Sequence, residues 1–193
     1  AFVARHRGIG PALLLLFLTA LCLKPYLELL AGFADGVFGR GVEGLATLAS
    51  AYGFGALLSA TIVANFSRPR TLAGLLFAAL LLAAAVQMVM SLTSHFWVAI
   101  LCSALLGGCL SAAFISVQVL IQGAVPGEMR GRVMSFWNVI NRGGPGAGAL
   151  IVGGLSEIWG FQPPLFGAAV VFFVIWAIYM RRRRALTAHL MPA

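Results

Sequence analysis

Residues 71–92 read TLAGLLFAALLLAAAVQMVMSL, and this run decides the fold class. It carries no charged side chain, and Gln87 is its only side-chain amide. A helix needs about 20 predominantly apolar residues to cross the hydrocarbon core of a bilayer, which is about 30 Å thick. The run supplies them, so the sequence predicts a membrane-spanning helix here.

Working outward from this run, similar apolar stretches repeat along the whole chain. Proline, glycine and charged residues mark the gaps between them, as at Asp35-Gly36 and Pro126-Gly127. We predict an all-α membrane protein, with a single domain over residues 1–193 and six transmembrane helices. The first helix is expected to be retained, because its apolar run continues past signal-peptide length. The expected spans are approximately 9–32, 44–66, 71–92, 96–122, 133–156 and 163–180.

The composition excludes two other classes of protein. Hydrophobic residues make up 61% of the chain and charged residues only 9%, against about 25% charged residues in an ordinary soluble domain. Too little polar sequence remains to solvate a water-soluble surface. The net charge of +8 does not indicate nucleic-acid binding, because the basic residues sit in short clusters between apolar stretches.

The placement of the basic residues predicts the orientation in the membrane. Six spans put both termini on one side, and that side collects ten of the 13 Lys and Arg residues, whereas the opposite loops carry only Arg40. By the positive-inside rule the arginine-rich side is cytoplasmic. We expect a multi-pass protein of the cell inner (plasma) membrane with both termini in the cytoplasm.

Several glycines are expected to serve helix packing. Gly53 and Gly55 lie in the second stretch, and Gly144 and Gly148 form a G-x-x-x-G pair in the fifth. Small residues let helix backbones touch inside lipid, where burial of apolar side chains offers little attraction between helices. Pro145 removes a helix donor beside these glycines, so this run is also a candidate bend.

Ionisable residues within the spans are the sharpest functional signal. Lys24 and Glu28 lie four residues apart, so they share one helix face and either pair with each other or contact a substrate. Arg142 lies near the middle of the fifth stretch, where a lipid-facing arginine would cost about 2.5–3.5 kcal/mol. A polar stripe around it belongs either to a buried structural network or to a cavity. The candidate cavity residues are Arg142, Asn138, Ser135, Asn141, Gln118, Lys24 and Glu28.

The cytoplasmic loops carry a second pattern, in which arginines stand next to glycine, proline or an acid. Positive-inside charge explains the arginines but not these neighbours. We expect a conformational switch in these loops, with Asn65, Arg68, Arg70, Glu128, Arg130 and Arg132 as candidates. The three cysteines and three histidines show no metal-ligand spacing, and no catalytic motif is found, so neither a metal, a cofactor nor an enzymatic activity is expected.

These motifs resemble the C-terminal half of the major facilitator superfamily, in particular the bacterial branch of enterobactin-exporter-like proteins. Residues 53–57 and 68–70 resemble the second copy of the family's loop motif, with Asn65 about where an acid is often found. Residues 125–133 resemble the loop before the eleventh helix, and residues 25–30 resemble the seventh helix.

The resemblance implies a twelve-helix, proton-driven exporter of a small solute. This chain would supply helices seven to twelve, arranged as two three-helix inverted repeats. Its partners would be the lipid bilayer, the substrate and an N-terminal six-helix half, or else a second copy of the chain. The alternative is a membrane scaffold or inactive truncated remnant without transport of its own.

Overall fold

The computed structural model describes residues 9–66, 68–125 and 127–181, and within them the chain is helical, with no strand. Five helical segments are long and apolar enough to cross a membrane: Gly10–Glu28, Gly41–Ala64, Pro69–Leu92, Phe96–Ala124 and Gln162–Arg181. The helices are α2 (Ile9–Cys22), α3 (Pro25–Glu28), α4 (Leu30–Gly36), α5 (Gly41–Ala64), α6 (Pro69–Leu92), α7 (Phe96–Ala124), α8 (Gly127–Trp159) and α9 (Gln162–Arg181).

Two of the predicted elements differ from the structure. The first expected span, 9–32, is divided into α2, α3 and α4, because Pro25 lacks the N–H that a continuous helix needs. The expected loop at 127–132 is instead the beginning of α8, so Glu128, Arg130 and Arg132 are helical. Glu128 stands in the first turn, where a negative charge is favourable beside the helix N-terminus.

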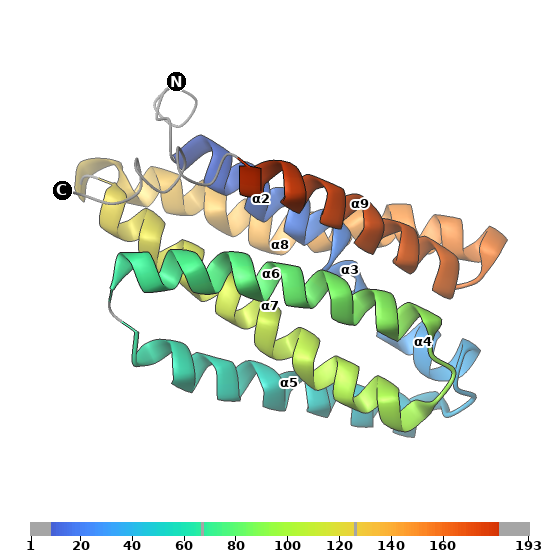
Figure 1. The fold of residues 1–193 in the computed structure, drawn as a ribbon. Helices are drawn as coiled ribbons and strands as arrows, with labels where there is room; N and C mark the ends of the chain where they lie inside the picture. The colour runs from blue at the N-terminus through green and yellow to red at the C-terminus, as the bar shows by residue number, and fades with distance from the viewer. Residues whose placement is uncertain (1–8, 67, 126, 182–193) are drawn as a thin grey trace.

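The long helices run roughly side by side, and their ends gather at two opposite ends of the bundle (Figure 1). The start of α2, the connections between α5 and α6 and between α7 and α8, and the end of α9 lie at one end. Arg68, Arg70, Arg130, Arg132 and Arg181 belong to that end, whereas Arg40 belongs to the other. The described residues therefore keep the asymmetric charge that the sequence predicted.

The helices pack in a definite order. α7 lies between α5 and α6 and packs against both, whereas α5 and α6 scarcely touch each other. On the other side of the bundle α8 packs against α2 and α3, and α9 packs against α6. The Trp176 indole N–H donates to the carbonyl of Phe77 at 2.9 Å, which ties α9 to α6.

Glycines stand at the two tightest helix contacts. On α5, a Cβ built at Gly55 would overlap the carbonyl of Ala104 on α7. On α8, a Cβ at Gly148 would overlap the carbonyl of Leu21 and the ring of Pro25. Gly144 faces Ala20 in the same crossing, with only 2.6 Å available to an added Cβ. Neither contact leaves room for a side chain.

Gly53 does not share this role. A Cβ built there would have no atom of the described residues within 4 Å, and the residue is exposed. Gly53 and Gly55 lie two positions apart on a helix, so they point in different directions and only Gly55 faces α7. Gly53 therefore packs against no neighbouring helix of the described residues, and its expected packing role stays a prediction.

This difference generates a matched test of the packing. Gly55→Ala should lower the free energy of unfolding by about 1–3 kcal/mol, because the added methyl group overpacks the contact with α7. Gly53→Ala, on the same helix, should leave stability unchanged or raise it slightly. Reversible denaturation in mixed detergent micelles measures both, and equal stability of the two variants would contradict the close contact.

Candidate functional site

The first membrane-spanning segment is interrupted at Lys24. α2 ends at Cys22 and α3 begins at Pro25, and the backbone N–H of Lys24 reaches back five residues to the carbonyl of Thr19 at 3.3 Å. The side-chain amide of Gln87 donates to the carbonyl of Cys22 at 3.0 Å, so this carbonyl is satisfied although the helix is broken. Inside a membrane each unpaired backbone group costs several kcal/mol, and Gln87 removes part of that cost.

The Lys24 side chain is held by two neighbours from other helices. Its Nζ donates to Oδ1 of Asn141 on α8 at 2.6 Å. The same atom lies 3.8 Å from the centroid of the Phe114 ring on α7, a cation–π distance. Lys24 is thus oriented by Asn141 rather than by Glu28, whereas the sequence spacing left open either pairing with Glu28 or contact with a substrate.

Lys24 and Asn141 border a cavity of about 340 Å³. It lies where α2 and α3 meet α5 and α8, and Arg142 and Glu28, both exposed, stand at its edge. The lining combines two cations, one acid, an amide and a phenol with two apolar side chains. The lining residues are Lys24, Leu27, Glu28, Tyr52, Asn141, Arg142 and Pro145.

The cavity lining offers both cationic and neutral hydrogen-bond donors. Lys24 and Arg142 carry formal positive charge against one negative charge on Glu28, so the lining favours an anionic group. Among the described residues no cluster of His, Cys, Asp and Glu is suited to hold a metal ion. The arrangement supports binding and orientation of a solute through side-chain donors.

The structure brings together four of the predicted cavity residues: Lys24, Glu28, Asn141 and Arg142. The other three do not line this cavity. Asn138 is exposed on α8, Ser135 donates from Oγ to the carbonyl of Gly131 at 3.0 Å, and Gln118 is half-buried on α7.

Two contributors were missed by sequence reasoning. Tyr52 lines the cavity from α5, and its phenol within an apolar span was a signal that could have been used. Phe114 carries no such signal, because an aromatic ring in an apolar run looks like any lipid-facing or core residue. Its role depends on Lys24, which lies 90 residues earlier in the sequence.

The candidate switch residues all lie at the arginine-rich end of the bundle. Asn65 ends α5, and its Nδ2 donates to the carbonyl of Thr61 at 2.9 Å. Arg68 immediately precedes α6, and Arg70 lies in its first turn. Glu128, Arg130 and Arg132 are exposed on the first turns of α8.

Comparison with known proteins agrees with a transport role. A search of curated proteins found no match for this chain. The major facilitator family described as transmembrane secretion effector matches residues 9–190, which points to a transporter rather than an enzyme. Because this match covers most of the chain, the protein belongs to the transmembrane secretion effector family of the major facilitator superfamily of membrane transport proteins.

Proposed function

We propose that this chain is one six-helix half of a twelve-helix secondary transporter, which exports a small solute by alternating access, coupled to protons. The cavity beside α3, α5 and α8 carries this proposal, because it gathers Lys24, Glu28 and Arg142 in an otherwise apolar bundle, with Lys24 half-buried and the other two at the cavity's edge. Polar groups within a membrane protein are expensive and mark solute or ion pathways. The solute is expected to be small, polar and anionic.

The exposed side of the cavity supports a facing half. Arg142 and Glu28 are exposed at its edge, and α5 buries only Gly44, Leu48, Gly55 and Val63. A second six-helix half placed against α5 and α8 would close the cavity and remove both charges from lipid. That half is either a separate N-terminal half or a second copy of this chain.

The packing order supports two three-helix inverted repeats. If α2–α6 form one repeat and α7–α9 the other, the second span of each repeat packs against the first span of the other: α5 against α7, and α8 against α2. The third spans, α6 and α9, pack against each other. This exchange of equivalent contacts is expected of repeats related by a pseudo-two-fold axis.

The repeat arrangement requires α8 to cross the membrane as well, as the fifth of six spans in chain order, although its composition is more polar than that of the other long helices. Its 33 residues correspond to about 50 Å of helix, well beyond the thickness of the hydrocarbon core. Asn141 and Arg142 on α8 face the cavity. A span that turns its polar face to a cavity does not need the uniform hydropathy of a lipid-facing helix.

The arginine-rich end is proposed to be cytoplasmic and to act as a switch. Asn65, Arg68, Arg70, Glu128, Arg130 and Arg132 all lie there, at helix ends that would separate and rejoin during alternating access. Individual exposed ion pairs and helix-end contacts contribute only about 0.3–1 kcal/mol. Contacts of such small free energy suit a switch, because they favour one conformation without preventing the change to the other.

The orientation is tested by thiol labelling in a variant without the native cysteines, all of which are buried. Gly36→Cys and Ser94→Cys should react with an impermeant thiol reagent added outside intact cells, because both positions lie at the end opposite the arginines. Asn65→Cys and Gly127→Cys should react only after the cells are opened. The reversed pattern would refute the orientation.

The role of Arg142 is tested by substitution in the assembled transporter. Arg142→Ala should reduce transport of small organic anions into or out of proteoliposomes by about 10–100-fold, as expected for one charge-assisted hydrogen bond to the solute. Arg142→Lys should retain part of the activity. Arg181→Ala, at the end of α9, is the matched control and should transport normally.

Membrane levels and thermal stability of the Arg142 variants separate a solute role from a structural one. Both variants should insert and melt like the wild type, because Arg142 is exposed rather than buried in a network. If Arg142→Ala instead unfolds the protein while transport per folded molecule is unchanged, the cavity assignment is wrong.

Proton coupling is assigned to Glu28, the acid that lines the cavity. Glu28→Gln should abolish transport driven by a pH gradient while retaining exchange of labelled for unlabelled solute, because exchange needs no net proton movement. Glu157→Gln, an exposed acid near the end of α8, is the control and should retain both activities. Gradient-driven transport that survives Glu28→Gln would exclude Glu28 as the coupling group.

A further inference from the structure

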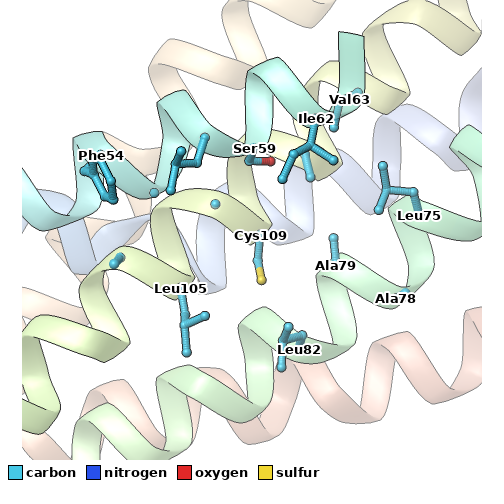
Figure 2. A pocket seen from close by; sticks show the side chains of 15 residues that line it. Phe54, Ser59, Ile62, Val63, Leu75, Ala78, Ala79, Leu82, Leu105 and Cys109 are labelled. Carbon is cyan, nitrogen blue, oxygen red and sulfur yellow. The ribbon is translucent and has the colours of Figure 1, made fainter. Parts of the chain in front are cut away.

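A long apolar groove runs between α5 and α6, on the outside of the bundle (Figure 2). Its volume is about 440 Å³. Phe54 and Ile62 line it from α5, Leu75 and Leu82 from α6, and Leu105 from α7. None of the cavity residues lines the groove, so the groove is separate from the cavity.

The groove follows directly from how the three helices pack. α5 and α6 both lie against α7 but scarcely against each other, which leaves a channel with α7 as its floor. Small residues on α7 leave the groove deep, since Gly108 and Ala112 line its base. On α5, Gly55 allows close contact with α7. Larger side chains at these positions would fill the channel.

The length and position of the groove match one leaflet of a bilayer. On α5 it extends from Phe54 to Val63, which is about 14 Å of helix and roughly half of the hydrocarbon thickness. It ends beside the connection between α5 and α6, at the arginine-rich end of the bundle. A single acyl chain entering from that end would occupy it along its whole length.

Two arginines stand where the head group of such a lipid would lie. Arg68 precedes α6 and Arg70 is in its first turn, and both are exposed. Arg70 lies five positions, or about 7.5 Å of helix, before Leu75 at the end of the groove. Guanidinium groups bind phosphate oxygens in a bidentate geometry, and the N-terminus of α6 adds favourable partial positive charge.

We propose that the groove and these arginines form a binding site for one anionic phospholipid. One acyl chain lies between α5 and α6, and the phosphate is bound by Arg68 and Arg70. The apolar walls exclude a polar ligand from the groove, and the paired cations select an anionic head group over a zwitterionic one. This site goes beyond solute transport and shares no lining residue with the cavity.

The head-group arm of the test uses native mass spectrometry of the full chain, purified in detergent. Phosphatidylglycerol and phosphatidylcholine with identical acyl chains are added in equal amounts. The wild type should retain one phosphatidylglycerol with about 10–30-fold preference, the effect of two arginines at a lipid surface. Arg68→Gln with Arg70→Gln should lose the preference, whereas Arg181→Gln, an arginine at the same end, should keep it. Equal retention of the two lipids by the wild type would overturn the proposal.

The groove arm uses two matched substitutions on α6. Ala78 lines the groove and Ala85 does not, and both are exposed, so phenylalanine is tolerated at either position without disturbing the helix contacts. Ala78→Phe should remove most of the retained phosphatidylglycerol, and Ala85→Phe should leave it unchanged. Equal retention by the two variants would show that no acyl chain occupies the groove.

A third measurement distinguishes a lipid from a free phosphate and does not depend on variants. Phosphatidylglycerol with a photoactivatable group in its acyl chain should cross-link to groove positions such as Leu82 and Leu105. Excess glycerol phosphate should not displace it, because the head group alone lacks the acyl chain. Displacement by glycerol phosphate, or cross-links spread evenly over all exposed helix faces, would contradict the site.

Discussion

Helices inside a bilayer gain little by burying apolar side chains against each other, because the surrounding lipid is equally apolar. Cohesion depends instead on close backbone contact, and here that contact is made at two glycine crossings. Gly55 lets α5 reach the backbone of α7 at Ala104, and Gly148 lets α8 reach the backbone of α2 at Leu21. The rest of the bundle is arranged around these two crossings, and they set the spacing of the cavity and of the groove.

The crossings are also where the polar site is assembled. On α8, Asn141, Gly144 and Gly148 follow at intervals of three and four residues, so they share one helix face. At Gly148, α8 comes close to the first span. The same close approach brings Asn141 within hydrogen-bond distance of the Lys24 side chain. The helix packing and the polar cavity therefore depend on one set of contacts, and a change at Gly148 is expected to alter the cavity as well as the stability.

Sequence patterns predicted the helical class, the positions of five spans and four of the residues that meet at the cavity. Those features depend on local composition or on depth in the membrane, which a single chain displays directly. The division of the first span and the start of α8 at Gly127 were not predicted, because both depend on partners distant in sequence or on a helix that extends beyond the apolar core. The role of Phe114 is of the same kind, since it arises only when α7 meets Lys24.

The cavity and the groove differ because the helices beside them differ in continuity. At the cavity, α3 begins after a break, so backbone and charged groups need polar partners, and Asn141 and Gln87 provide them. At the groove, α5, α6 and α7 are unbroken, their backbone groups are satisfied within each helix, and only apolar surface remains between them. A broken helix therefore yields a cavity with a polar lining, whereas three intact helices that diverge yield an apolar groove.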